Sequence, residues 1–229
     1  MSVNHEIGVI FDLDGTLVAS EVLYYDATEA LLAPLGRSLK ELTPEEKARI
    51  PGRSAVVNME FYRRRFGLEP PAVELVEGRL AELIRMVRDD GVDLLPGVFG
   101  FLEGLKARGF RLALASSAPR NYVNAVLDVT GLGSYFPVQK TGSDVKRYKP
   151  DPEIFQSAGQ ALGIPPERCL VVEDAHSGFL AARAADMKIL AVRGDYTLSE
   201  QYELADRLVD DFRGLGPDDV IDLLGVGRA

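Results

Sequence analysis

Four short apolar runs of the kind that form buried strands recur along the chain. They are residues 8–11, 112–115, 170–172 and 189–192. The last three are each followed within a few residues by a helical pattern of apolar positions. Near-continuous apolar strands that alternate with helices indicate a parallel sheet that is covered on both faces. The pattern therefore predicts an α/β fold.

The stretch between the first two runs has helical periodicity and no convincing strand. Apolar side chains recur three or four positions apart over residues 23–35 and again over residues 73–87. This is the spacing of one face of a helix. We therefore predict a core formed by residues 1–16 and 93–229, with residues 17–92 inserted as a small helical domain.

The charge balance restricts the partners. The 229 residues include 26 Lys and Arg and 35 Asp and Glu, a formal net charge of -9. Nucleic acids and anionic membranes both favour a basic face, so this balance argues against either as a partner. Residues 1–6 lack the basic and apolar regions of a signal peptide, and no apolar run approaches the roughly 20 residues that span a bilayer. We expect a cytoplasmic protein whose one cysteine, Cys169, is a buried structural thiol.

The end of the first apolar run carries two carboxylates. Asp12 and Asp14 face the same side of an extended segment, and Gly15 then allows a sharp turn. Open parallel sheets bind ligands at the carboxyl ends of their strands. Adjacent carboxylates repel unless a cation or a shared proton intervenes, and hard oxygen ligands favour Mg²⁺. An EF-hand calcium loop is excluded because Leu17 and Leu23 occupy the positions of its glycine and glutamate. An Asx turn that simply ends the strand remains an alternative to a metal site.

Polar residues also follow the other runs. Ser116 and Ser117 end the second run, where hydroxyls and free N–H groups at a helix start can bind an anion or simply cap the helix. Lys149 is held extended by the proline after it, although a lone lysine is usually a solvated charge. Glu173 and Asp174 follow the third run and could bind a metal or cap a helix. Together these strand ends indicate a site for a metal and a phosphate.

The ordered set Asp12-Leu13-Asp14-Gly15-Thr16, Ser116, Lys149 and Glu173-Asp174 resembles the four motifs of the haloacid dehalogenase-like hydrolase superfamily. The insertion after the first motif resembles the helical cap of the β-phosphoglucomutase-like phosphatases in that superfamily. The resemblance covers essentially the whole chain. It implies a Rossmann-like parallel-sheet core with an inserted α-helical cap domain.

The resemblance also implies a role for each motif residue. Asp12 would be the nucleophile that forms an aspartyl-phosphate, and Asp14 would be the general acid and base. The phosphate oxygens would be held by Ser116, Ser117 and Lys149. The ligands of Mg²⁺ would be Asp12, the backbone carbonyl of Asp14 and Asp174, with Glu173 as a further ligand or a partner of the ligands.

Departures from the family patterns reduce the number of activities that the resemblance allows. Dehalogenases of the superfamily lack the second aspartate, so Asp14 argues against dehalogenation. Sugar phosphomutases carry a cap histidine where this chain has Tyr24, a poor acid–base group at neutral pH. Phosphonate-cleaving members use a cap lysine where this chain has Arg53, which cannot form a Schiff base. We expect a Mg²⁺-dependent phosphatase for a small sugar phosphate or sugar-acid phosphate. A β-phosphoglucomutase-like mutase and a non-catalytic regulatory relative stay as alternatives.

Selectivity for the substrate would depend on the cap and on the loop after the second strand. The residues that we expect to contact the substrate there are Tyr24, Arg53, Asn58, Arg120 and Asn121. The expected partner is this phosphorylated small molecule, and we expect the chain to be a monomer or a weak dimer.

Overall fold

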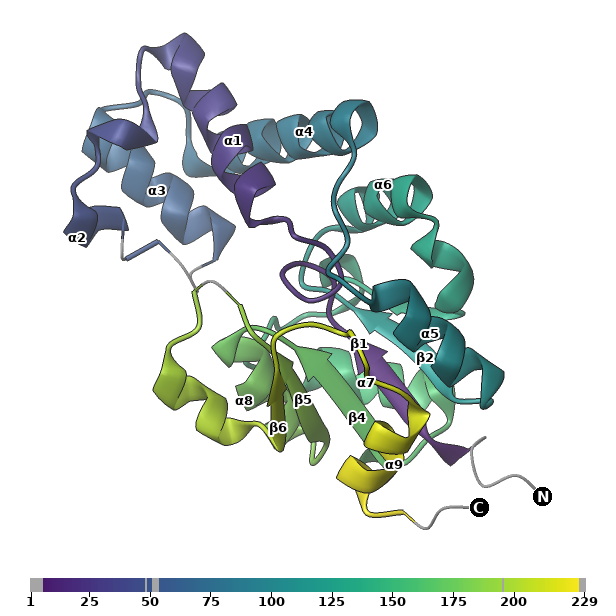
Figure 1. Ribbon diagram of the computed structural model, residues 1–229. Helices are drawn as coiled ribbons and strands as arrows, with labels where there is room; N and C mark the ends of the chain where they lie inside the picture. Colours follow the sequence, from purple (N-terminus) through teal and green to yellow (C-terminus); the bar gives the residue numbers. More distant parts are fainter. Residues whose placement is uncertain (1–5, 48, 51–53, 195, 227–229) are drawn as a thin grey trace.

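The computed structural model describes residues 6–47, 49–50, 54–194 and 196–226. Within these residues, six parallel strands form one sheet in the order β3-β2-β1-β4-β5-β6 (Figure 1). The strands are β1 (Gly8–Phe11), β2 (Arg111–Ala115), β3 (Val138–Lys140), β4 (Cys169–Glu173), β5 (Lys188–Val192) and β6 (Arg207–Val209). The chain builds outward from β1 to β3 and then returns to the other side of β1, so the order reverses between β1 and β4. The sheet confirms the α/β class and its Rossmann-like parallel core.

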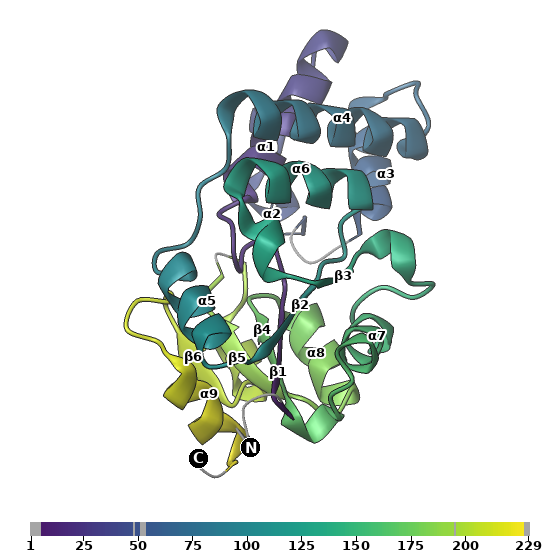
Figure 2. The same cartoon turned by 90° about the vertical axis from the view of Figure 1, so that its right-hand side faces the viewer.

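Helices cover both faces of the sheet, as Figure 2 shows. One face packs against α5 (Val98–Ala107), α6 (Arg120–Thr130) and α9 (Pro217–Leu224), and the other against α7 (Glu153–Leu162) and α8 (His176–Ala184). Side chains of a strand alternate between the faces, so each of the four central strands β1, β2, β4 and β5 contributes to two apolar clusters. These four strands are buried on both sides, which explains their near-continuous apolar sequences.

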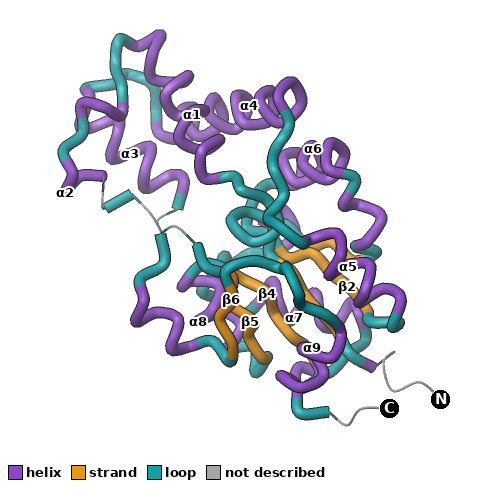
Figure 3. Tube along the Cα trace, viewed as in Figure 1, coloured by secondary structure: helices purple, strands orange, loops and turns teal. Residues whose placement is uncertain are grey.

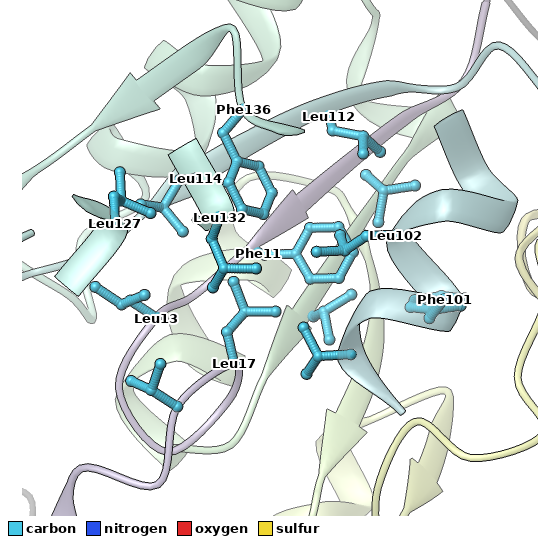
Figure 4. Packing of buried hydrophobic residues seen from close by; sticks show 14 of the residues in the cluster. Phe11, Leu13, Leu17, Phe101, Leu102, Leu112, Leu114, Leu127, Leu132 and Phe136 are labelled. Carbon is cyan, nitrogen blue, oxygen red and sulfur yellow. The ribbon is translucent and has the colours of Figure 1, made fainter. Parts of the chain in front are cut away.

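The apolar cluster beneath β1 also anchors the loop that follows the strand (Figure 4). The Phe11 ring lies 6.0 Å from that of Phe101 and 5.7 Å from that of Phe136, between ring centroids. Leu13 and Leu17 extend the same cluster and are fully buried. Truncation of a buried phenylalanine to alanine typically costs about 3–5 kcal/mol. This packing therefore fixes the backbone on both sides of the polar residues between Phe11 and Leu17.

A helical segment lies above the carboxyl edge of the sheet (Figures 1 and 3). It contains α1 (Glu21–Leu32), α2 (Pro44–Lys47), α3 (Ala55–Phe66) and α4 (Ala72–Asp90). α1, α3 and α4 enclose an apolar cluster of their own, and α4 also packs against α6. The two connections to the sheet run side by side, because the Ala19 N–H donates to the Asp93 carbonyl at 2.9 Å.

Short 3₁₀ helices complete the described chain. They are η2 (Ala33–Leu35), η3 (Leu39–Glu41), η4 (Leu132–Tyr135), η5 (Gly142–Asp144), η6 (Pro166–Arg168) and η7 (Ser199–Leu204). No helix of the described residues is long and apolar enough to cross a membrane.

The sequence patterns missed the two outer strands of the sheet, β3 and β6. Each has only three residues, and most of their side chains are half-buried. An edge strand is covered less than a central one, so it lacks the continuous apolar run that identified the inner strands. Cys169 begins a central strand and is fully buried, as predicted, and burial raises the pKa of its thiol to about 12.

Candidate active site

The candidate site lies where β1 and β4 end side by side. The strand order reverses between these strands, which is where open parallel sheets bind ligands. Asp12 directly follows β1, Glu173 is the last residue of β4, and Asp174 comes next. One carboxylate oxygen from each of the three lies within 4.8 Å of the others. The parallel register thus brings together acids that are more than 160 residues apart in the chain.

Lys149 joins this carboxylate cluster from the loop before α7. Its ammonium group donates to Asp12 Oδ1, to Glu173 Oε2 at 2.7 Å and to the Ala115 carbonyl at 3.1 Å. The side chain is only 5% exposed. The ammonium nitrogen also lies 4.7 Å above the Phe155 ring centroid. All three ammonium hydrogens therefore have acceptors, which holds the charge at the strand ends.

Both carboxylate oxygens of Glu173 are engaged. Oε2 accepts from Lys149, while Oε1 accepts from the backbone N–H groups of Asp174 and Ala175 at 3.2 and 3.1 Å. The first turn of α8 packs directly on this carboxylate: a Cβ on Gly178 would lie 2.1 Å from Glu173 Cδ. Glycine is therefore required there, and Glu173 is held rigidly between α8 and Lys149.

Asp174 is oriented by the loop after β1. Thr16 Oγ1 donates to Asp174 Oδ1 at 2.9 Å, and Thr197 Oγ1 donates to the Asp174 carbonyl at 2.7 Å. Gly15 has a φ of +74°, and a Cβ there would lie 2.3 Å from Asp174 Oδ2. The turn predicted at Gly15 thus has a second function, since it lets the backbone pass close to the carboxylate.

Asp14 lies in different surroundings. The Tyr122 hydroxyl donates to Asp14 Oδ1 at 2.7 Å, and the hydroxyls of Ser20 and Tyr24 also interact with this carboxylate. Tyr122 belongs to α6 and is fully buried, whereas Ser20 and Tyr24 lie at the start of α1. Asp14 is therefore surrounded by neutral hydroxyl donors.

The electrostatics of the cluster favour a bound cation. Burial, followed by the repulsion of Glu173, raises the pKa of Asp12 to about 7 even though Lys149 lowers it. Burial and the charges of Glu173 and Asp12 raise the pKa of Asp174 well above its usual value. One ammonium group thus leaves the negative charge only partly compensated. Because the donors are carboxylate oxygens at one point, the residues present fit a hard divalent ion such as Mg²⁺.

Ser116 and Ser117 follow β2, beside this cluster. The Ser116 hydroxyl is buried and accepts from the Ala118 N–H at 3.1 Å. Ser116 also directly follows Ala115, whose carbonyl accepts from Lys149. Ser117 is exposed. The structure therefore places Ser116 next to the Lys149 ammonium. Its hydroxyl accepts within the loop before α6 and does not cap that helix, whose N-cap residue is Pro119.

Two of the residues expected to contact substrate have other partners. The Arg120 guanidinium forms an ion pair with Asp144 and donates to the Gln139 carbonyl at 3.3 Å. Asn121 is exposed, and its side-chain oxygen accepts from the Tyr122 N–H at 3.0 Å. Both residues lie in the first turn of α6 rather than in the loop before it, and these contacts tie Arg120 to β3 and η5 and Asn121 to its own helix.

The other three expected contacts come from the helical segment. Tyr24 lies with its ring centroid 6.1 Å from that of Tyr122, at the edge of the Asp14 surroundings. Asn58 is buried in α3 and donates to the Ile50 carbonyl at 3.1 Å. Arg53 lies outside the described residues. Of these, the structure brings Tyr24 to the strand ends.

The sequence analysis missed two side chains, one that contacts Asp14 and one that contacts Tyr24. One is Tyr122, which only the fold brings to β1, because its position on the buried face of α6 is that of an ordinary core residue. The other is Arg79 of α4, whose guanidinium lies 5.4 Å above the Tyr24 ring centroid. Its Nε atom is buried and has no hydrogen-bond partner among the residues that the structure describes. Arg79 lies four positions after Leu75 and four before Leu83, on the buried face of α4, so a charged residue on an apolar helix face was a signal that the sequence analysis did not use.

Comparisons with known proteins identify the family. Residues 8–186 match the model of the haloacid dehalogenase-like hydrolases. Protein CbbY of Rhodobacter capsulatus is 29% identical over 209 residues, 89% of this chain and 92% of the relative. A phosphorylated carbohydrates phosphatase of Thermotoga maritima is 32% identical over 181 residues, 79% of this chain and 82% of the relative. The crystal structure of CbbY from Rhodobacter sphaeroides in complex with xylulose-(1,5)bisphosphate has a TM-score of 0.79 at 27% identity, covering 91% of this chain and 96% of that one. The chain belongs to the haloacid dehalogenase-like hydrolase family.

Proposed function

We propose that this protein is a Mg²⁺-dependent phosphatase that hydrolyses a small phosphorylated sugar or sugar acid through an aspartyl-phosphate intermediate. The observation that carries the proposal is the environment of Asp12. This carboxylate lies at the reversal point of the sheet, beside Lys149 and within 4.8 Å of Glu173 and Asp174. A nucleophile, a cation-binding group of acids and a fixed ammonium are the parts that phosphoryl transfer needs.

The reaction divides between the two aspartates of the loop after β1. An oxygen of Asp12 attacks the phosphorus while the bond to the leaving oxygen breaks, and Asp14 gives its proton to that oxygen. Water then attacks the aspartyl-phosphate and gives a proton to Asp14. The acyl–phosphate bond breaks, which releases inorganic phosphate and restores both side chains.

The surrounding residues stabilise the charge that moves during these steps. Lys149 and Ser116 are assigned to the phosphoryl oxygens. Asp12, Asp174 and the Asp14 carbonyl would hold Mg²⁺, which when bound neutralises charge on the phosphoryl group. Glu173 acts indirectly, because both of its oxygens already accept hydrogen bonds from Lys149 and from the backbone.

The substrate class follows from the relatives and from the helical segment. A relative is named as a phosphatase of phosphorylated carbohydrates, and another was crystallised with a sugar bisphosphate. In this chain, residues 17–92 act as a cap domain that closes over the core of residues 1–16 and 93–229. Tyr24 and Arg79 lie on the side of the site that faces the cap. The buried Nε of Arg79 has no hydrogen-bond partner among the residues that the structure describes, so this guanidinium suits a hydroxyl-rich or anionic part of the substrate.

Phosphate release tests this proposal. A panel of phosphorylated metabolites is incubated with Mg²⁺ or with EDTA, with the wild type, with Asp12→Asn and with the exposed control Asp210→Asn. We expect a preferred sugar or sugar-acid phosphate, and no turnover with EDTA or with Asp12→Asn. Retention of more than about a tenth of the wild-type rate by Asp12→Asn would contradict the nucleophile assignment. Silence across the panel would favour a mutase or a regulatory role.

The proposal extends to the setting in which the enzyme works. We infer a cytoplasmic enzyme and a monomer or weak dimer. Fractionation of cells and light scattering at several protein concentrations test these two points.

A further inference from the structure

Tyr122 makes a contact that the proposed mechanism does not use. It lies in the first turn of α6, the helix that follows β2 after a short loop, and is fully buried. Its hydroxyl donates to Asp14 Oδ1 at 2.7 Å. This bond joins residues 108 positions apart in the chain, so only the folded sheet can form it.

The bond controls how the Asp14 carboxylate is oriented. The last side-chain torsion angle of an aspartate has a broad, roughly twofold distribution, so the rotamer alone does not fix where each carboxylate oxygen points. A phenol that donates to Oδ1 removes this freedom. It also leaves a proton carried by Asp14 on the other oxygen, Oδ2. The orientation of the proton is thus set from α6.

Tyr122 differs from the other two hydroxyls near Asp14 by its position in the fold. Ser20 and Tyr24 lie at the start of α1, within the helical segment. Tyr122 follows a strand of the sheet and belongs to the same apolar cluster as Phe11, next to Asp12. It is therefore attached to the rigid layer that also holds the nucleophile, which is where a precisely placed group needs its support.

We propose that Tyr122 is a positioning residue, which fixes the carboxyl group of Asp14 so that its proton faces the leaving oxygen of the substrate. This inference rests on the proposed phosphatase function, and it assigns a residue outside the four motifs to the proton-transfer step. In that step the P–O bond breaks as the Asp14 proton moves to the departing oxygen. Tyr122 keeps its own proton throughout.

Leaving-group dependence distinguishes positioning from a purely structural hydrogen bond. 2,4-Dinitrophenyl, 4-nitrophenyl and phenyl phosphate have rings of similar size but increasingly poor leaving groups. Only the poor leaving groups need a proton from Asp14 as the bond breaks. We expect Tyr122→Phe to lower kcat/KM for phenyl phosphate roughly tenfold more than for 2,4-dinitrophenyl phosphate, about the effect of one hydrogen bond to a charged group. Unfolded protein in the sample lowers the apparent kcat/KM of both esters by the same factor, so it does not change the ratio between them.

A matched variant and a matched background complete the test. Tyr135→Phe removes another tyrosine hydroxyl that donates to a carboxylate, that of Glu103 on α5, and the ratio should stay at the wild-type value. In an Asp14→Asn background, Tyr122→Phe should change the ratio no further.

The outcomes separate this inference from the proposed function. If the wild type hydrolyses these esters and Tyr122→Phe keeps the wild-type ratio, Tyr122 does not position Asp14. The same conclusion follows if the ratio still changes in the Asp14→Asn background. If the wild type hydrolyses neither these esters nor any phosphorylated metabolite of the panel, the proposed function fails, and the inference fails with it. If it hydrolyses only a metabolite of the panel, whose leaving alcohol is poor, Tyr122→Phe should lower kcat/KM for that metabolite about tenfold, and an unchanged value overturns the inference.

Discussion

Asp12 and Asp14 are two residues apart on one loop, yet their surroundings differ in kind. Asp12 belongs to an ionic cluster, in which two carboxylates, those of Asp12 and Glu173, share the ammonium group of Lys149. Asp14 is surrounded by hydroxyls, of which Tyr122 is the one at 2.7 Å. Burial raises the pKa of both aspartates, so burial alone does not distinguish them.

The difference in partners suits different chemistry. An ammonium group favours the carboxylate form, which is the form that can attack phosphorus. Hydroxyl groups carry no charge, so a carboxyl group among them can take up and release a proton without breaking an ion pair. Two chemically identical side chains can thus be assigned different roles from their neighbours alone.

The largest expected effect comes from removing each aspartate in turn. Asp12→Asn should abolish turnover of every phosphate ester, because no nucleophile remains. Asp14→Asn should lower kcat/KM for phenyl phosphate about 10²–10⁴-fold, the usual contribution of general acid catalysis, and spare 2,4-dinitrophenyl phosphate. Steady-state kinetics with both esters provide the measurement. Equal losses on both esters in Asp14→Asn would remove the distinction between the two aspartates.

The next largest effect is expected from removing the Lys149 ammonium group from the ionic cluster around Asp12, which we call the ionic side of the site. Lys149→Met leaves buried carboxylates without their cation, which should lower the free energy of unfolding by about 3–5 kcal/mol in EDTA. It should also lower kcat by about 10²–10³-fold, as expected for loss of one charge-stabilising donor. Urea denaturation and phosphate release measure the two effects. Lys146→Met is the control, since Lys146 is exposed, and it should behave as wild type.

These two sides of the site were not equally predictable from the sequence. The ionic side follows from residues at strand ends, because apolar runs locate the strands and parallel strands end at one edge. The surroundings of Asp14 depend on how α1 and α6 pack over that edge. Tyr122 lies on the apolar face of an amphipathic helix, where the pattern predicts only a buried core residue. Its contact with Asp14 appears only when α6 is placed against β1.

The same contrast applies to the fold. The central strands, each buried on both faces, were predicted almost to the residue, whereas the half-buried edge strands β3 and β6 were not. Arg120 illustrates a further limit. Its place after Ser116 and Ser117 suggested a substrate contact, but η5 brings Asp144 to its guanidinium. A charged residue at the start of a helix finds its partner through tertiary packing, which no local pattern encodes.

The pH dependence of stability offers a smaller and more specific test of the ionic side. In the folded protein the pKa of Asp12 is about 7, against an ordinary value of 3.8. Between these values the unfolded chain has lost the proton that the folded protein keeps. In EDTA, stability should therefore fall as the pH rises from about 4 to about 7, by at most about 1.4 kcal/mol per pH unit from Asp12. The raised pKa values of Asp14 and Asp174 act in the same direction.

Urea denaturation at a series of pH values measures this slope. Asp12→Asn should reduce it, because the amide does not titrate. The exposed control Asp210→Asn should leave the slope unchanged. A metal-free protein whose stability rises over this range would show that the carboxylates are already compensated without a cation.

The smallest effect is expected from Tyr24→His, which places a group that titrates near neutral pH among the hydroxyl groups around Asp14. Tyr24 stands where related mutases have a histidine, so the substitution tests whether that one group decides between hydrolysis and phosphoryl transfer to a second hydroxyl. We expect no conversion of β-glucose 1-phosphate to glucose 6-phosphate in a coupled assay. The imidazole would lie beside Tyr122 and beneath the Arg79 guanidinium. The substitution leaves both of these neighbouring residues as they are in the wild type. A mutase must also hold a sugar in two orientations and keep water from the aspartyl-phosphate, and one imidazole supplies neither. Formation of glucose 6-phosphate by this variant would instead mean that the rest of the cap is already built for a mutase, and that Tyr24 alone had prevented the transfer.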